Sequence, residues 1–400
     1  MRVLIAGAGI GGLAAALTLL RHGFEVSIHE HARTLSEVGA GLQIGPNGAK
    51  VLHALGLSEA LSRVAFYPEA GEMRVGTSGR VIFSLPLGEP ARRRYGAPYY
   101  HLHRADLQAV LLQAVKARSP GCIHLGQEVR EVRQDAQGVE LGFVDGTSVR
   151  GDLLIGADGV HSVVRRELFD IADGEYSGMS AWRMTVPASR LPKGLVPPKA
   201  TVWVGPGKHV VTYYLRGGEL VNLVNLVGVV EEAEWPYDSW TSLGSKADIR
   251  RDFAGWHPII QRILEAGDDG EYYKWALREL PPLEHWSKGR VTLLGDACHP
   301  MLPFMAQGAV MAIEDAWVLA EQLARNHQDL PGALSRYESL RKPRATRVQS
   351  ASRRNGKLYH QHSTAGQAVL YSPLWMVSRV APDFFAGQLD WLYGEDVTTC

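Results

Sequence analysis

The sequence predicts an α/β fold: a domain of parallel strands and helices, an antiparallel β-sheet inserted into it, and a helical C-terminus. Residues 2–30 read as strand, glycine turn, helix and strand, the order of a βαβ unit with parallel strands. Separated β-rich runs fill the middle of the chain, and helical composition dominates beyond Arg341. A chain of 400 residues also exceeds what one hydrophobic core usually holds. We therefore expect a discontinuous domain of residues 1–174 and 272–345, an inserted domain of residues 175–271 and a helical segment of residues 346–400.

Composition and charge exclude several classes of protein. Hydrophobic residues make up 46% of the chain and charged residues 21%, as in ordinary globular proteins. Lys+Arg and Asp+Glu number 42 each, so no net field draws the chain to nucleic acid or an anionic membrane, and the basic run 92–94 is expected to be surface. The cysteines Cys122, Cys298 and Cys400 are widely spaced and indicate neither a disulfide framework nor a zinc site. A cytoplasmic protein, monomeric or homodimeric, fits these observations.

The apolar run from Val3 to Leu20 resembles a signal peptide or a membrane helix. Its glycines argue against that interpretation, because each weakens a helix by about 1 kcal/mol. Gly7, Gly9, Gly11 and Gly12 fall within six positions. The run is better divided into a buried strand, a turn and a buried helix.

The remaining elements follow from periodicity and turn signals. Helices are expected at residues 104–117 and 309–323, where apolar side chains recur at helical spacing. Asp145-Gly146 marks a tight turn between two strands. The expected strands are residues 128–134, 139–143, 148–150, 153–155, 200–204, 209–215, 220–229 and 291–294.

The glycine turn carries the pattern of a dinucleotide-binding loop. Gly7 permits a tight turn, Gly9 lets the backbone approach a pyrophosphate, and Gly12 allows the helix to pack closely on the strand. The phosphates would then meet unpaired N–H groups at the positive end of a helix dipole. Glu30 ends the next strand, where its carboxylate would accept hydrogen bonds from ribose hydroxyls. This Rossmann-like unit alone does not distinguish NAD from FAD.

Two further strand ends favour FAD. The buried strand at residues 291–294 runs into Gly295-Asp296, and an acid at this place suits hydrogen bonds to a ribityl chain. The helix that begins near Ala309 would stabilise negative charge on a reduced flavin through its dipole. The strand at residues 153–155 runs into Asp158-Gly159. Asp158 has an alternative role as a turn-forming residue.

The chain resembles the class A, single-component flavoprotein aromatic hydroxylases. The resemblance covers nearly the whole chain. Within this family the chain looks most similar to the salicylate, 3-hydroxybenzoate and 6-hydroxynicotinate hydroxylase branch. It rests on GAGIGG (7–12), EVGAGLQIGPNG (37–48), HRADL (103–107), GADGVHSVVR (156–165) and GDACHPMLPFMAQGAVMAIEDA (295–316).

The resemblance implies a p-hydroxybenzoate hydroxylase-like fold, FAD as cofactor, NADH or NADPH as co-substrate, and a small phenolic substrate. Oxygen would add at the flavin C4a, and the resulting hydroperoxide would hydroxylate the ring. The glycine motif, Glu30 and Arg33 would hold the ADP half of FAD, Asp296 the ribityl chain, and Gly308 with Ala309 the isoalloxazine. The implied cofactor residues are Gly7, Gly9, Gly11, Gly12, Glu30, Arg33, Gln43, Arg104, Val129, Asp158, Asp296, Gly308 and Ala309.

The catalytic candidates His209 and Tyr213 lie on an expected strand of the inserted sheet. Residues two apart on a strand share one face, so both side chains should face the same space. A phenol must lose its proton to attack an electrophilic oxidant, and a histidine is the natural base or relay. Hydroxybenzoate enzymes resemble this sequence in having a His and a Tyr here. A structural, hydrogen-bonded histidine is the alternative.

Three positions, Gln43, Ala200 and Pro303, bear on the identity of the substrate and favour different branches of the family. Hydroxynicotinate enzymes have a histidine at Gln43 and a cysteine near Ala200, which weakens a hydroxypyridine substrate. The 3-hydroxybenzoate enzymes have a glutamine at Pro303, where salicylate-type enzymes resemble this chain better. Arg183 and Arg216 are candidates to bind a substrate carboxylate. The alternatives are a 6-hydroxynicotinate-type hydroxylase, a non-aromatic flavin epoxidase or reductase, an NAD-dependent dehydrogenase and a non-catalytic sensor.

His299 lies near Asp296 and Cys298 and invites a metal-site interpretation. The spacing places the three residues in a turn, and the sequence offers no fourth ligand nearby. Pro300, which follows directly, favours a loop. We expect no metal.

Overall fold

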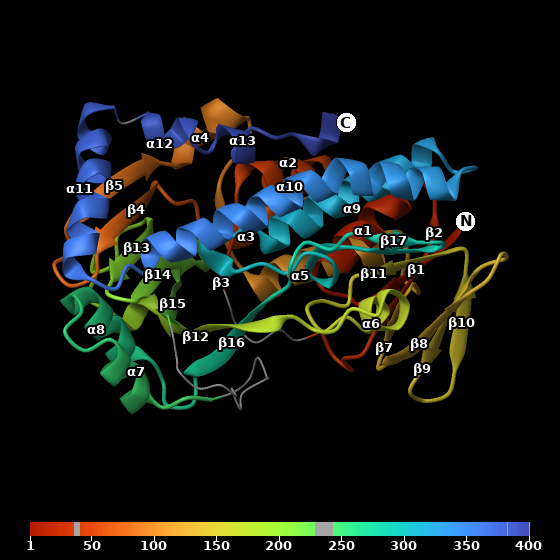
Figure 1. The fold of residues 1–400 in the computed structure, drawn as a ribbon, viewed down its shortest axis with the longest axis horizontal. Helices are drawn as coiled ribbons and strands as arrows, with labels where there is room; N and C mark the ends of the chain where they lie inside the picture. Colours follow the sequence, from red (N-terminus) through yellow and green to blue (C-terminus); the bar gives the residue numbers. More distant parts are fainter. Residues whose placement is uncertain (36–40, 229–242, 382, 400) are drawn as a thin grey trace.

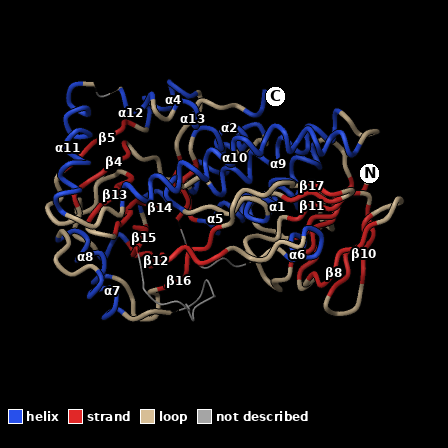
Figure 2. Tube along the Cα trace, in the orientation of Figure 1, coloured by secondary structure: helices blue, strands red, loops and turns tan. Residues whose placement is uncertain are grey.

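The computed structural model describes residues 1–35, 41–228, 243–381 and 383–399 (Figure 1). Residues 37–40 of the EVGAGLQIGPNG motif and Val229 of an expected strand lie outside this part of the chain. Strands gather toward the two ends of the molecule, and a long helix runs between them (Figure 2). The expected α/β architecture is confirmed.

The N-terminal βαβ unit forms as predicted and lies at the centre of a parallel sheet. β1 (Arg2–Ala6), α1 (Ile10–Arg21) and β2 (Glu25–Glu30) follow in order, and β1 pairs in parallel with both β2 and β11 (Leu153–Gly156). Four of the five residues of β1 are buried, which explains its unbroken apolar sequence. The sheet order is β17-β18-β11-β1-β2-β7, with β17 (Ser287–Lys288) as an antiparallel edge, β18 at Val291–Leu293 and β7 at Ile123–Leu125.

Helices and a small sheet complete this half. α1 packs against α5 (Arg104–Arg118) and α9 (Gly308–Arg325), both close to their expected bounds. The three-stranded antiparallel sheet, also expected, contains β8 (Val129–Gln134), β9 (Val139–Phe143) and β10 (Ser148–Gly151). The other elements here are β3 (Gly41–Ile44), α2 (Pro46–Ala54), α3 (Ser58–Val64), α4 (Gly88–Tyr95), β6 (Tyr100–His103) and α6 (Val163–Phe169).

The inserted sheet is larger than expected. Its seven strands run in the order β16-β12-β15-β14-β13-β4-β5. Their bounds are β4 Ala70–Val75, β5 Val81–Pro86, β12 Glu175–Pro187, β13 Ala200–Gly205, β14 Lys208–Leu215, β15 Leu220–Gly228 and β16 Tyr273–Glu279. β4, β5 and β16 come from outside residues 175–271, and β13 pairs with β4 in parallel. Pairing between segments so distant in sequence leaves no local signal. The expected domain boundaries stay a prediction, and this sheet contains strands from both sides of them.

The two faces of the inserted sheet differ. One packs against α7 (Lys246–Asp252) and α8 (Pro258–Ala266) and buries Trp203 and Val210. Because side chains alternate along a strand, His209 next to Val210 belongs to the opposite face. The candidate active site lies on that opposite face.

Long helices connect the halves. α10 (Leu330–Tyr359) has 30 residues and a length of about 45 Å, so it runs from the parallel sheet to the inserted sheet (Figure 1). α11 (Thr364–Val380), α12 (Phe384–Gly387) and α13 (Asp390–Tyr393) follow and confirm the helical C-terminus. Within the described residues, no helix has the length and apolarity needed to cross a bilayer.

Candidate active site

The glycine turn has the geometry of a phosphate cradle. Gly7 has a φ of 99°, in the left-handed region, and a Cβ there would lie 2.5 Å from the Ala157 carbonyl oxygen. A Cβ on Gly12 would lie 2.1 Å from the Gly7 oxygen, so the helix starts directly against the turn. A Cβ on Gly9 would meet no described residue within 4 Å. The turn therefore leaves open space in front of the N-terminus of α1, where an anion would be stabilised.

Glu30 lies beside this turn as expected. Its buried carboxylate accepts hydrogen bonds from the Ala8 N–H at 2.7 Å and the Ala32 N–H at 2.9 Å. Gln108 of α5 donates to the Ala8 carbonyl at 3.1 Å, and Arg104 precedes it by one helical turn on the same face. The turn, Glu30 and α5 thus form one polar site that fits the nucleotide half of a dinucleotide.

Two predicted contacts at this end lie nearer the surface. Arg33 is exposed, and a Cβ on Gly126 would lie 3.7 Å from its Cγ. Val129 begins β8 three residues later and is half-buried. Their roles toward a cofactor stay predictions.

Asp158 is occupied by its own helix. One of its oxygens accepts from the Ser162 hydroxyl at 2.5 Å and the other from the Val164 N–H at 3.1 Å, so the carboxylate caps α6. Burial raises the pKa of this carboxyl. The turn-forming role considered for Asp158 is therefore present, and a contact with the cofactor stays a prediction.

Asp296 and the N-terminus of α9 meet at the end of β18. Asp296 is exposed in the short turn Gly295–Ala297, and a Cβ on Gly308 would lie 3.8 Å from its Oδ1. Gly308 and Ala309 open α9, whose dipole has its positive end here. A strand-end acid and a helix N-terminus from segments adjacent in sequence thus border the same space.

That space is a cavity of about 560 Å³ between the α9 N-terminus and the inner face of the inserted sheet. Six predicted site residues line it: Gln43, His209, Tyr213, Asp296, Gly308 and Ala309. The glycine turn, Glu30, Arg33, Arg104, Val129 and Asp158 do not belong to its wall. The separation of the predicted cofactor residues into these two groups fits an elongated cofactor. Its nucleotide half would lie at the glycine turn and its ring half would reach the cavity.

His209 and Tyr213 face this cavity together from β14, as the strand period predicts. His209 is 1% exposed, and its Nδ1 lies 2.8 Å from Nε2 of His360, which follows α10. Burial, and then the charge of His360, hold the pKa of His209 well below its ordinary value. Tyr213 is 3% exposed; burial raises the pKa of its phenol, and the charge of Arg183 opposes that rise.

Arg183 and Arg216, the two candidates for binding a carboxylate, differ in position. Arg216 is exposed and forms a two-point ion pair with Asp106, with both N···O distances 2.8 Å. Arg183 projects from β12 into the cavity wall, with its guanidinium 4.3 Å from the ring centre of Trp275. Of the two, Arg183 can reach a ligand beside Tyr213.

The sequence analysis did not find His360 or Tyr99 as site residues. Tyr99 donates its hydroxyl to Gln43 Oε1 at 2.8 Å and so fixes a side chain of the cavity wall. Neither residue lies in a motif, and each reaches the site through a contact between distant segments. The positions that gave conflicting indications on the substrate, Gln43, Ala200 and Pro303, all line the cavity.

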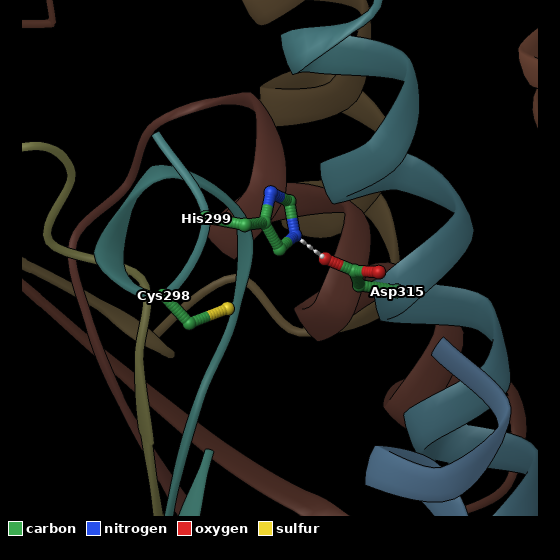
Figure 3. A group of neighbouring side chains, drawn as sticks. All are labelled: Cys298, His299 and Asp315. Atoms are coloured by element: carbon green, nitrogen blue, oxygen red, sulfur yellow. Dashed lines mark hydrogen bonds and ion pairs between the residues drawn. The ribbon is translucent and has the colours of Figure 1, made fainter. Parts of the chain in front are cut away.

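His299 and Cys298 lie together with Asp315 of α9, and their ligand atoms are within 4.8 Å of one another (Figure 3). α9 adds an acid that local sequence did not indicate, because Asp315 Oδ2 lies 2.5 Å from His299 Nε2. The second Asp315 oxygen accepts from Arg341 Nε at 2.7 Å. Burial raises the pKa of the Cys298 thiol, which disfavours the thiolate form that binds metals. The group forms part of a buried ion-pair network, and the expectation of no metal stays a prediction.

Comparisons with known proteins agree with this geometry. Residues 1–352 match the family described as FAD binding domain. The chain is 40% identical to a 3-amino-4-hydroxybenzoate 2-monooxygenase of Streptomyces platensis, over 90% of this chain and 88% of the relative. It is 37% identical to the 3-hydroxybenzoate 6-hydroxylase of Polaromonas naphthalenivorans, over 100% and 97%. It is 39% identical to the 6-hydroxynicotinate 3-monooxygenase of Pseudomonas fluorescens, over 88% and 91%.

Solved structures show the same fold. Klebsiella pneumoniae HpxO complexed with FAD and uric acid has a TM-score of 0.84 at 29% identity, over 95% of this chain and 94% of that one. A salicylate hydroxylase substrate complex has a TM-score of 0.81 at 26% identity, over 100% and 96%. The named relatives do not favour a non-aromatic epoxidase or reductase. The chain therefore belongs to the FAD-binding-domain family and, within it, to the class A flavoprotein aromatic hydroxylases.

Proposed function

We propose that this hydroxylase acts on a small phenol that also carries a carboxylate, such as a hydroxybenzoate, with NADH or NADPH as reductant and O2 as oxidant. One observation carries the proposal: His209, Tyr213 and Arg183 line the same cavity as the α9 N-terminus. The cavity thus offers a base, a phenol hydroxyl and a cation beside the expected flavin ring. The relatives named for aminohydroxybenzoate, hydroxybenzoate and hydroxynicotinate support this class, because each name denotes a ring with a hydroxyl and a carboxylate.

His209 is proposed to take the proton of the substrate phenol. Its Nδ1 is engaged with His360, which leaves Nε2 for the substrate hydroxyl. The lowered pKa keeps the imidazole neutral at neutral pH, the form that accepts a proton. Removing this proton makes the ring electron-rich, as electrophilic hydroxylation requires.

Tyr213 and Arg183 are proposed to orient the substrate. The raised pKa of Tyr213 keeps its hydroxyl protonated, so the hydroxyl can donate a hydrogen bond to the phenol oxygen. Arg183 would bind the carboxylate, since a guanidinium matches two carboxylate oxygens at once. Together the two residues would fix which ring carbon faces the flavin.

FAD, when bound, supplies the oxidising equivalent that NAD(P)H and O2 generate on its ring. The glycine turn would hold its phosphates, Glu30 its ribose and Asp296 its ribityl chain. The N-terminus of α9 would stabilise negative charge on the reduced ring. Pro303, Phe304 and other apolar residues of the cavity wall would exclude water from the reacting atoms.

A panel of ring compounds tests the proposal. Purified protein loaded with FAD is given salicylate, 3-hydroxybenzoate, 3-amino-4-hydroxybenzoate or 6-hydroxynicotinate, with benzoate as the control without a hydroxyl. NAD(P)H loss and product mass are followed together. At least one phenol should stimulate NAD(P)H oxidation and gain one oxygen, while benzoate yields no product. A protein that holds FAD yet hydroxylates none of the four, nor any ring-alkylated derivative of them, would contradict the proposal.

We also infer a cytoplasmic location. Of the three cysteines, the structure describes Cys122 and Cys298, and both are free and buried. Thiols kept in this form are typical of reducing compartments. Whether the chain is a monomer or a homodimer stays open in this proposal.

A further inference from the structure

The floor of the cavity is a row of side chains that crosses six strands of the inserted sheet. In the strand register, each residue of the row is paired with the following one on the neighbouring strand. All six line the cavity: Arg183, Val224, Val211, Val202, Met73 and Phe83. Five steps between neighbouring strands span about 24 Å at the usual spacing. The row begins with a cation and continues with apolar side chains.

The catalytic candidates stand near the middle of this row. His209 and Tyr213 flank Val211 on β14, two strands from Arg183 and three strands from Phe83. The stretch from β14 to β5 therefore covers about 14 Å on the side away from Arg183. A substrate ring held between His209 and Tyr213 would therefore leave the floor on β4 and β5 uncovered.

This stretch is apolar and has room above its floor. In the adjacent row Ala200 pairs with Gly71, and Gly71 pairs with Leu85, so the smallest side chains lie nearest the centre. Among the described residues, a Cβ on Gly71 would have Leu87 as its only neighbour within 4 Å, at 3.8 Å. Glu72 borders the same end, but its carboxylate is paired with Lys199 at 2.6 Å and Arg74 at 2.7 Å.

The C-terminal helices form the roof and close the far end. Leu374 of α11 and Phe385 of α12 line the cavity, and the Phe385 ring stacks on Phe83 with centroids 4.5 Å apart. α11 is held in place, because Tyr371 donates to the Leu358 carbonyl at 2.9 Å and Ser378 donates to the Ile82 carbonyl at 3.2 Å. The floor from β14 to β5 and the C-terminal helices thus enclose an apolar compartment, and these hydrogen bonds fix its walls.

We propose that the preferred substrate is a hydroxybenzoate that carries an apolar substituent on the side of the ring opposite its carboxylate. The inference rests on the proposed function and narrows its substrate class. The carboxylate binds Arg183, the phenol lies between His209 and Tyr213, and the substituent fills the compartment bounded by Gly71, Leu85 and Phe385. Burying the substituent supplies binding energy that a lone ring cannot obtain.

A homologous series of ligands tests the proposal by binding alone. The FAD-loaded protein is titrated with 3-hydroxybenzoate and with its derivatives that carry a methyl, propyl or pentyl group para to the carboxylate. The dissociation constant is read from the change in flavin absorbance. Each buried methylene should lower the dissociation constant about fourfold, until the compartment is full. A dissociation constant that stays level or rises with chain length would overturn the proposal.

A matched pair of glycine variants locates the effect. Gly71→Val places a branched side chain on the compartment floor, while Gly121→Val makes the same change on the surface, where a Cβ would meet nothing within 4 Å. Gly71→Val should remove the advantage of the pentyl derivative and leave 3-hydroxybenzoate within about twofold, while Gly121→Val changes neither. If Gly71→Val does not fold, the ligand series still decides.

The two proposals fail separately. If neither the phenol panel nor the alkyl derivatives are hydroxylated, the proposed function fails, and the narrower substrate class fails with it. If the panel is hydroxylated but the alkyl groups weaken binding, the proposed function stands and the apolar compartment does not select the substrate.

Discussion

The two halves of the molecule differ in how their sites are encoded. In the parallel half, the glycine turn, Glu30 and the start of α1 lie within the first 30 residues and form one polar site. In the inserted half, the cavity floor takes residues from β4, β5, β12, β13, β14 and β15, which meet only through strand pairing. The comparison teaches that the polar site at the glycine turn is encoded by a short motif, while the cavity floor depends on register between distant strands.

The strongest test of the first half is Gly9→Val. A Cβ at Gly9 meets nothing within 4 Å, so the chain should fold normally, but the side chain would occupy the space proposed for the pyrophosphate. We expect this variant to lose most of its FAD, because the backbone can no longer approach the phosphates. The measurement is flavin retained after gel filtration, with Gly121→Val as the control. A Gly9→Val protein that keeps its FAD would contradict the assigned cradle.

His209→Ala tests the inserted half at its centre. Loss of a general base should slow hydroxylation by about 100-fold or more. FAD should remain bound, because His209 lies on β14 of the inserted sheet, whereas the glycine turn follows β1 of the parallel sheet. Rapid-mixing measurement of product formation checks the rate, and flavin absorbance checks the cofactor. Unchanged turnover would remove His209 from the mechanism.

Arg183→Met and Arg216→Met form a matched pair for the carboxylate site. Losing a hydrogen bond to a charged group costs about 1.5–3 kcal/mol, so the Arg183 variant should bind 3-hydroxybenzoate roughly ten- to a hundredfold more weakly. Arg216 is already paired with Asp106 at the surface, and its variant should stay within about twofold. Equal losses in both variants would show that the effect is not specific to the cavity.

The pH dependence should be the smallest effect. Burial holds the pKa of His209 well below its ordinary value of 6.5, so its neutral, proton-accepting form persists as the pH falls toward that value. The rate of hydroxylation at saturating phenol should therefore stay level around neutral pH and decline only in more acidic buffer. A decline centred on 6.5 would mean that His209 titrates as an exposed histidine and that the buried His209–His360 contact does not govern it.

The sequence was informative where function depends on neighbours along the chain. It predicted the βαβ unit, the acid at Glu30, the start of α9 and the shared face of His209 and Tyr213, because turn chemistry and strand period are local. It could not place the β4–β5 hairpin in the inserted sheet, since β13, the partner of β4, lies more than a hundred residues away in the chain. The same limit explains why His360 was missed.

Packing between separate elements also fixes two positions that local sequence does not. Asp315 of α9, not Asp296, lies beside His299. Arg183 rather than Arg216 reaches the cavity, because Asp106 binds Arg216 at the surface. In each case the competing residues have the same chemistry, and only their position in the fold distinguishes them.

The most direct test of the central claim follows the oxygen atom. The FAD-loaded protein is supplied with NAD(P)H, isotopically heavy O2 and the best phenol of the panel, and the product is analysed by mass spectrometry. The account predicts one heavy oxygen in a new ring hydroxyl, lost in the His209→Ala variant while FAD stays bound. A hydroxyl derived from water, or NAD(P)H oxidation by the phenol-bound enzyme without any hydroxylated product, would contradict it.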